Sequence, residues 1–183
     1  TQDVFATVAT TRGWLSNGIS RPTLATGGNG NDVFGVYSNE APLTLHGDAG
    51  DDLFTVRAFA LAQTSGGEIV WRDVAGRVAM PVLNGTQVAY HLNDSVAIDG
   101  GSGFDKTEAL ATEFGDHVVV DATGVYGAGL TVSVTTIEAL EVDTLEGDDT
   151  IDVVGTAAGI STRVIGGLGS DVVDVTEDVL PDV

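Results

Sequence analysis

Six-residue segments that are rich in glycine and end in aspartate recur along this sequence, and both residue types are suited to binding a hard cation. Three of them have the form Gly-Gly-x-Gly-x-Asp, at residues 27–32, 100–105 and 166–171. Residues 47–52 depart from this form only at the second position, and residues 144–149 keep only Gly147 and Asp149. Ca²⁺ takes about six to eight oxygen ligands from carboxylates, carbonyls and water, and glycine allows the backbone angles that turn carbonyls inward. The spacing therefore predicts calcium-binding turns.

Strands must hold each of these turns in place. Apolar residues at the second and fourth positions after the terminal aspartate predict strands with one buried face, at 33–36, 53–56, 150–153 and 172–175. Successive terminal aspartates are separated by 20, 53, 44 and 22 positions. Separations of 20 and 22 suit a rung of two strands with one glycine turn and one ordinary turn. A separation of 44 suits two such rungs, and 53 requires two rungs and an insertion.

With a large apolar residue two positions after the aspartate, these segments resemble the nonapeptide repeat of the RTX (repeats-in-toxin, hemolysin-type) calcium-binding family. The resemblance implies an all-β fold: a parallel β-roll or β-helix (solenoid) with about one calcium-binding glycine turn per rung and an inserted β-hairpin. It also implies Ca²⁺ as the cofactor and a secreted or cell-surface location in a bacterium. Familiar members of the family repeat the nonapeptide in tandem and this chain does not, so only one corner of each motif-bearing rung is expected to bind calcium.

Carried onto this sequence, the family's calcium ligands are the aspartate that ends each turn and residues whose carbonyls line it. Ca²⁺ is expected between the turns that end at Asp32 and Asp52, and between those that end at Asp149 and Asp171. Asp105 can meet a neighbour only if the intervening residues loop out. The full set of expected ligand positions is Asp32, Asp52, Asp105, Asp149, Asp171, Gly27, Asn29, Gly30, Gly47, Ala49, Gly50, Gly100, Ser102, Gly103, Gly147, Gly166, Leu168 and Gly169.

Stacked turns of this kind bring carboxylates close together. Neighbouring strands lie about 4.8 Å apart. At that distance two carboxylates repel by about 1 kcal/mol in water and by about 3 kcal/mol at an effective dielectric constant of about 20. Cations neutralise such pairs, and a metal that binds only the folded chain adds to its stability. We therefore expect the chain to gain β-structure when Ca²⁺ binds.

The composition excludes several other classes of function. The chain has 183 residues, with 27 acidic and 7 basic side chains, and its formal net charge is −20. This charge repels nucleic acids and anionic membrane surfaces, and no apolar stretch is long enough for a transmembrane helix. Because cysteine is absent, the chain has neither disulfides nor thiolate metal sites.

No arrangement of residues predicts catalysis, and the chain is not expected to be an enzyme. The histidines His46, His91 and His117 form no zinc-binding motif, and neither a nucleophile elbow nor a phosphate-binding loop is present. The few basic residues are scattered, which argues against an enzyme that acts on acidic polysaccharides.

The whole chain, residues 1–183, is interpreted as a single segment of a longer protein with an insertion at about 57–95. Within the insertion, residues 78–83 and 86–90 flank an Asn-Gly pair, which predicts a β-hairpin. Loops on one side of a repeat structure are frequent binding surfaces. A glycan site there would use Trp71, Tyr90 or Arg72, whereas the alternative is an insertion that only covers apolar rungs.

These observations predict a calcium-binding structural module of a secreted or cell-surface bacterial protein (adhesin, surface-layer or RTX-type), which folds and becomes rigid on binding Ca²⁺. Its expected partners are calcium ions, neighbouring segments of the same array or copies of itself, and a glycan. Neither nucleic-acid binding nor membrane insertion is expected. The alternative function is a carbohydrate-binding or accessory module of an extracellular polysaccharide-active enzyme, and glycan binding by the insertion would favour it.

Overall fold

A computed structural model describes residues 7–61, 64–65, 68–69, 82–83, 86–87 and 90–175. These residues form strands, turns and loops, and no helix occurs among them. The described part of the chain accordingly contains no helix that is long and apolar enough to cross a membrane.

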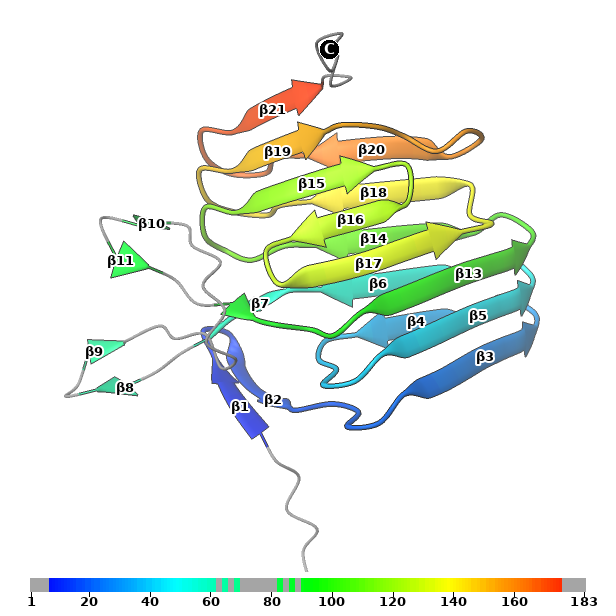
Figure 1. The fold of residues 1–183 in the computed structure, drawn as a ribbon, viewed down its shortest axis with the longest axis horizontal. Helices are drawn as coiled ribbons and strands as arrows, with labels where there is room; N and C mark the ends of the chain where they lie inside the picture. The colour runs from blue at the N-terminus through cyan, green and yellow to red at the C-terminus, as the bar shows by residue number, and fades with distance from the viewer. Residues whose placement is uncertain are drawn as a thin grey trace, which may run out of the picture.

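Two sheets face each other and enclose the apolar core (Figure 1). The larger sheet has eight strands in the order β21-β19-β15-β16-β17-β13-β5-β3, and the smaller has five in the order β20-β18-β14-β6-β4. The larger sheet consists of β3 (Thr23–Asn29), β5 (Leu43–Ala49), β13 (Val96–Ser102), β15 (His117–Asp121), β16 (Gly124–Gly127), β17 (Leu130–Thr135), β19 (Thr150–Val153) and β21 (Val172–Val175). The smaller sheet consists of β4 (Val33–Val36), β6 (Leu53–Arg57), β14 (Lys106–Leu110), β18 (Ala139–Asp143) and β20 (Ser161–Ile165).

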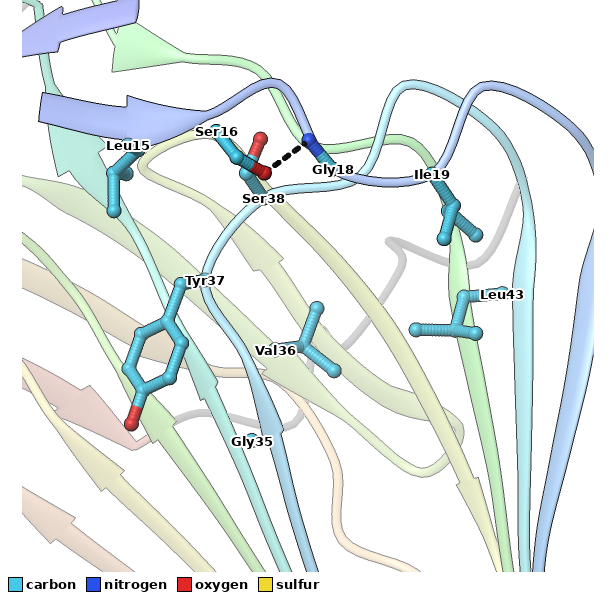
Figure 2. A pocket seen from close by; sticks show the side chains of 9 residues that line it. All are labelled: Leu15, Ser16, Gly18, Ile19, Gly35, Val36, Tyr37, Ser38 and Leu43. Carbon is cyan, nitrogen blue, oxygen red and sulfur yellow. Dashed lines mark hydrogen bonds between the residues drawn. The ribbon is translucent and has the colours of Figure 1, made fainter. Parts of the chain in front are cut away.

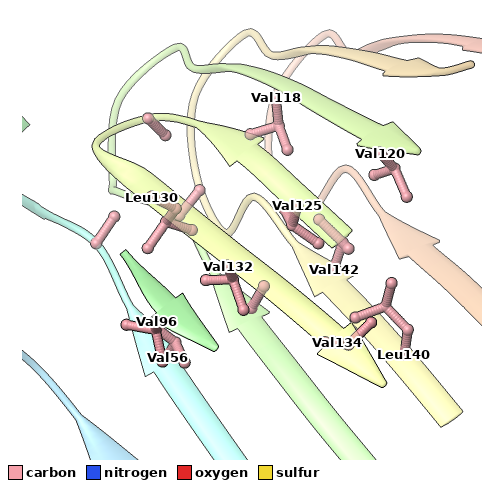
Figure 3. Packing of buried hydrophobic residues seen from close by; sticks show 14 of the residues in the cluster. Val56, Val96, Val118, Val120, Val125, Leu130, Val132, Val134, Leu140 and Val142 are labelled. Atoms are coloured by element: carbon pink, nitrogen blue, oxygen red, sulfur yellow. The ribbon is translucent and has the colours of Figure 1, made fainter. Parts of the chain in front are cut away.

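The alternation of side chains along each strand decides which face is buried. In β6, Phe54 and Val56 are fully buried, while the residues between and beside them are partly exposed. Phe54 also stacks on Phe34 of β4, with ring centroids 4.9 Å apart and planes 6° apart. Side chains from both sheets meet in the same way in the middle of the molecule (Figure 3), where they include Val56, Val96, Val118, Val132 and Val142.

The larger sheet is mixed, and this contradicts the predicted fold class. Strand β16 runs antiparallel to both β15 and β17, whereas the remaining pairs of the two sheets are parallel. The prediction of a parallel β-roll or β-helix with about one glycine turn per rung is therefore wrong. The physical reason is a tight turn after β15, where the Asp121 carboxylate accepts the N–H groups of Thr123 (2.6 Å) and Gly124 (3.1 Å). The chain reverses there within one sheet instead of crossing to the other.

The turns that join the two sheets lie at two opposite edges (Figure 1). Turns that leave the larger sheet after β3, β5, β13 and β17 form one edge, which we call the Asp52 edge. Turns that enter the larger sheet before β15, β19 and β21 form the other, the Asp149 edge. Asp105 and Asp149 consequently lie at opposite edges, so the interpretation of their 44-residue separation as two equal rungs is wrong.

The described residues between 58 and 95 form an excursion from the stack that does not separate the adjoining strands. Strand β5 pairs directly with β13, and β6 pairs with β14. At the base of the excursion, β7 (Phe59–Ala60) pairs antiparallel with β12 (Tyr90–His91). Farther out, β8 (Thr64–Ser65) pairs with β9 (Glu68–Ile69), and β10 (Val82–Leu83) with β11 (Thr86–Gln87). The expected Asn84-Gly85 turn between the last two strands lies outside the described residues.

A hairpin of β1 (Thr7–Thr10) and β2 (Gly13–Ser16) precedes the stack. The N–H of Thr11 donates to the carbonyl of Ala60 at 3.1 Å, and Nε of Arg12 lies 3.1 Å from Oε2 of Glu113. These contacts attach the hairpin to the base of the excursion and to the Asp149 edge.

Candidate functional site

At the Asp52 edge, each terminal aspartate donates its backbone N–H to a carboxylate of the next turn. Oδ1 of Asp52 accepts the N–H of Asp32 at 2.7 Å, and Oδ1 of Asp105 accepts the N–H of Asp52 at 2.8 Å. Glu138 extends the series, because its Oε2 accepts the N–H of Asp105 at 2.7 Å. The structure thus brings three of the five predicted aspartates into one ladder of carboxylate–amide bonds.

The Asp149 edge carries a second ladder. Oδ1 of Asp171 accepts the N–H of Asp149 at 3.1 Å, and Oδ1 of Asp149 accepts the N–H of Asp116 at 2.7 Å. The ladder ends at Asp116, whose carboxylate accepts the N–H of Thr112 at 2.7 Å and its hydroxyl at 3.0 Å. The Tyr90 hydroxyl also hydrogen-bonds to Asp116. The predicted pairing of Asp149 with Asp171 therefore has a geometric counterpart.

Glu138 and Asp116 are the ladder residues that the sequence reasoning missed. Asp116 follows Gly115 and directly precedes β15, so it had a weak signal as the remnant of a glycine turn. Glu138 lies in a turn of residues 136–138 that contains no glycine, and no sequence signal would have found it.

The first glycine of each turn leaves room for the carboxylate that ends the turn. A methyl group on Gly47 would collide with Oδ2 of Asp52 and with the carbonyl oxygen of Gly100. A methyl group on Gly100 would meet Oδ2 of Asp105 and the carbonyl oxygen of Thr136. The same relation to the turn's own aspartate holds for Gly27 with Asp32 and for Gly166 with Asp171. At Gly47 and Gly100, a carboxylate oxygen and a carbonyl oxygen of the next layer thus converge on one small space.

In four of the ladder aspartates, Oδ2 is buried without a hydrogen-bond donor. Oδ2 of Asp32, Asp52, Asp105 and Asp149 has no hydrogen-bond partner among the described residues. Asp52 is 2% exposed, Asp105 0% and Asp149 1%. A carboxylate oxygen that has lost water without gaining a donor is costly. Each of these oxygen atoms is therefore an unused hydrogen-bond acceptor that lies beside the first residues of its own turn.

The glycine at the fourth position of the turns is required by its backbone angle and by the close stacking of the turns. Gly50 has a φ of 139° and Gly169 a φ of 146°, in the region that favours glycine. A methyl group on Gly50 would clash with the carbonyl oxygen of Gly30, and one on Gly169 with that of Gly147. Gly103 has the same relation to Gly50. These glycines hold adjacent turns in contact, which keeps their carboxylates in line.

At the third position, three of the carbonyls predicted to bind calcium also accept a backbone N–H of the adjoining turn. Strands β3, β5 and β13 extend through the first three turn residues and end at Asn29, Ala49 and Ser102. The carbonyl of Ala49 accepts the N–H of Gly30 at 2.7 Å, and that of Ser102 accepts the N–H of Gly50 at 2.9 Å. The Leu168 carbonyl likewise accepts the N–H of Gly147 at 2.8 Å. Only the second lone pair of these three carbonyls remains for a cation.

The fifth position of the turns forms an exposed ladder that runs in the opposite direction. Oδ1 of Asn31 accepts the N–H of Asp51, and Oδ1 of Asp51 accepts that of Phe104, both at 2.9 Å. At the other edge, Oδ1 of Asp148 accepts the N–H of Ser170 at 2.9 Å. Fifth-position side chains thus reach toward the later turn, and sixth-position side chains toward the earlier one.

Burial dominates the electrostatics of the ladders. It raises the pKa of Asp105 and of Asp149 above the ordinary value of a carboxyl group. Burial also raises the pKa of Asp116 to about 7, although hydrogen bonds from Tyr90 and Thr112 lower it. Among the described residues, no ion pair joins a basic side chain to a ladder aspartate. A bound cation would favour the ionised carboxylates and lower these pKa values.

The oxygen atoms that the ladders offer as metal ligands fit a hard cation. They are carboxylate and carbonyl oxygens, four of them are unpaired Oδ2 atoms, and none is a soft ligand. Within the described segments, no group of three or more His, Cys, Asp or Glu side chains converges on one point. A Ca²⁺ ion held here would therefore draw on Oδ2 of the aspartates and take most of its ligands from backbone carbonyls and water.

Of the three residues expected to bind a glycan, the structure describes Tyr90 alone. Tyr90 is 2% exposed and faces Asp116, so its ring is not on the surface. Trp71 and Arg72 lie outside the described residues. His91, at 6% exposure, hydrogen-bonds through Nε2 to the Ser38 hydroxyl at 2.6 Å and belongs to the base of the excursion.

Comparison with protein-family models, with curated proteins and with solved structures finds no match to this chain. The resemblance to the RTX repeats therefore depends on the glycine turns alone.

Proposed function

We propose that this chain is a calcium-binding structural module of a secreted or cell-surface bacterial protein, and that Ca²⁺ stabilises the stacking of its turns. The observation that carries the proposal is the set of unpaired, buried Oδ2 atoms on Asp32, Asp52, Asp105 and Asp149. The carboxylates of Asp52, Asp105 and Asp149 have an amide donor on one oxygen only. An extracellular calcium module is expected to bind with micromolar to millimolar affinity.

The ladder residues would serve this function by holding the carboxylates in register. Oδ1 of Asp52, Asp105 and Asp149 is fixed by an amide of the adjoining turn, which keeps their Oδ2 atoms from rotating away to solvent. The glycines at the first and fourth positions have no side chain, so carboxylate and carbonyl oxygens of the stacked turns can lie close to them. Ca²⁺, when bound, supplies positive charge where no basic side chain among the described residues does so. The function of the module would then be to provide a rigid pair of sheets.

Calcium titration of the chelator-treated chain tests the proposal. We expect added Ca²⁺ to increase the far-ultraviolet circular dichroism of β-structure and to raise the unfolding temperature in a saturable way. Mg²⁺ at the same concentration is the control, because it demands octahedral geometry and gives up water reluctantly. Unchanged dichroism and unchanged unfolding temperature, with metal analysis showing that the starting protein was free of calcium, would contradict the proposal.

A further inference from the structure

Tyr37 places an exposed aromatic ring on the outer face of the smaller sheet. It follows directly after β4, and the residue is 51% exposed. The ring lies against Gly35, whose hypothetical Cβ would be 3.2 Å from Cε2 and 3.6 Å from Cζ of the ring. Because Gly35 has no side chain, the ring can lie over the strand with much of its surface open to solvent.

Arg57 adds hydrogen-bond donors beside this ring. Its Cζ lies 5.2 Å from the centroid of the Phe59 ring, and Phe59 in turn packs against Tyr37 with centroids 6.3 Å apart and planes 60° apart. Nε of Arg57 is buried and has no acceptor, and in the described segments no ion pair includes this residue. The guanidinium thus packs on an aromatic ring, as a cation–π contact permits, and no carboxylate among the described residues pairs with it.

A pocket of about 380 Å³ adjoins Tyr37 (Figure 2). Its walls include the apolar side chains of Leu15, Ile19, Val36 and Leu43, and three hydroxyl-bearing residues, Ser16, Tyr37 and Ser38, line it as well. The volume falls within the range of about 300–1,000 Å³ that is usual for small-ligand sites. Gly35 and Tyr37 line this pocket, and Phe59 contacts both Tyr37 and Arg57. We call the pocket, Gly35, Tyr37 and Arg57 together the Tyr37 surface.

We infer that the Tyr37 surface binds a neutral hexose oligosaccharide. The apolar face of a pyranose ring presents C–H groups that are attracted to the electron-rich face of an aromatic ring. Its hydroxyls accept hydrogen bonds from a guanidinium and exchange them with serine and tyrosine hydroxyls. This inference goes beyond the structural function proposed above, and its residues differ from Trp71, Arg72 and Tyr90 of the insertion.

The charge of the chain selects the neutral class of glycan. A formal net charge of −20 repels a polyuronate or a sulfated polymer over distances of about a Debye length, roughly 8–10 Å. A neutral glycan pays no such electrostatic cost. One arginine beside the ring supplies hydrogen bonds without creating a basic patch.

Isothermal titration of the full chain in saturating Ca²⁺ tests the inference, with hexasaccharides of β-1,4-glucose, α-1,4-glucose and β-1,4-mannose as probes and oligogalacturonate as the charged comparison. We expect at least one neutral probe to bind and oligogalacturonate to bind more weakly. Tyr37→Ala should weaken binding by about tenfold or more, as is usual for loss of an aromatic anchor. Tyr37→Phe should retain most of the affinity, and Arg57→Lys, which loses the planar fork of donors, should weaken it several-fold.

Phe104→Ala is the matched control, since Phe104 is 58% exposed and lies at the Asp52 edge, away from the Tyr37 surface. It should bind as the unmodified chain does. Thermal unfolding of each variant establishes that it is folded. Failure of the unmodified chain to bind any neutral probe would overturn the inference, and so would undiminished binding by folded Tyr37→Ala. Neither outcome bears on calcium, because calcium binding is read separately from the unfolding temperature.

Discussion

Oδ1 of Asp105 accepts the backbone N–H of Asp52 at 2.8 Å, although 53 residues separate the two in sequence. Both residues are the last of a glycine turn, so the repeated residue is at once the acceptor for one neighbour and the donor to another. The bond uses one carboxylate oxygen and leaves Oδ2 buried and unpaired. This single relationship, repeated at both edges, links the stacking of the turns to their proposed affinity for a cation.

Asp105→Asn should change stability in opposite directions with and without calcium. In chelator, the neutral amide keeps an oxygen for the N–H of Asp52 and removes a buried charge, so the free energy of unfolding should rise by the order of 1 kcal/mol. In saturating Ca²⁺ the variant should gain less stability than the unmodified chain, because a ligand charge is lost. Urea unfolding in both buffers measures this. Asp174→Asn is the control, because Asp174 is exposed on β21; equal calcium responses of all three proteins would contradict the ladder site.

Gly47→Ala should destabilise the chain by about 2 kcal/mol or more, as overpacked sites commonly do. The added methyl group would meet Oδ2 of Asp52 and the carbonyl oxygen of Gly100, neither of which can move without breaking the ladder. Gly155→Ala is the matched control, since the nearest atom to its new methyl group is the Ala122 nitrogen at 3.5 Å. Thermal unfolding should show a large decrease for the first variant and little change for the second. Similar unfolding temperatures for both would show that the first glycine is not required for packing.

Lys106→Met should destabilise the smaller sheet by about 1 kcal/mol. Nζ of Lys106 lies 2.7 Å from Glu108 and 3.3 Å from Glu141, two acidic residues that are directly opposite each other in β14 and β18. Without the lysine these carboxylates repel, as like charges in a cross-strand pair do. The loss should shrink at high salt, which unfolding at low and high ionic strength would detect.

Arg163→Met provides the comparison for that measurement. Arg163 also pairs with Glu141, at 3.2 Å, but its side chain is 70% exposed. Its loss should change the free energy of unfolding by less than about 0.5 kcal/mol. An effect as large as that of Lys106→Met would contradict the assignment of Lys106 as the residue that joins the two carboxylates.

The raised pKa of Asp116 predicts that the calcium-free chain becomes less stable as the pH rises. Its pKa is about 7 in the folded state against an ordinary 3.8, so the folded chain binds a proton that the unfolded chain has released. The stabilisation is fully present below pH 3.8 and is lost as the pH rises through about 7. Thermal unfolding in chelator between pH 4 and 8 should therefore show a flatter pH dependence for Asp116→Asn than for the unmodified chain. Parallel curves would show that Asp116 titrates normally.

Much of the local structure could be predicted from the sequence. The expected strands at 33–36, 150–153 and 172–175 coincide with β4, β19 and β21, and 53–56 lies within β6. Period-2 alternation after an aspartate is a local property, since it depends only on which side chains share a face. The glycine pattern likewise marked the turns, because positive φ angles and close approach leave few other choices at those positions.

The arrangement of the turns could not be predicted in the same way. A two-residue turn between β15 and β16 reverses the chain within the larger sheet, and the glycine turns then continue at the opposite edge. Glu138 joins a ladder from a turn without glycine because it faces Asp105 in space, a relationship that spacing along the chain does not encode. Tyr37 and Arg57, similarly, are neighbours only because β4 and β6 pair.

The sequence by itself determined which residues carry the acidic charge, where the turns occur and which oxygen-rich chemistry they offer, because these follow from residue type and short spacing. Only the tertiary structure decided which aspartates meet, at which edge they stack, and that in Asp52, Asp105 and Asp149 one carboxylate oxygen accepts an amide N–H while the other stays buried and unpaired. The physical reason is that hydrogen bonding and desolvation depend on the neighbour in the next layer. That neighbour is set by strand pairing across tens of residues, and not by the turn itself.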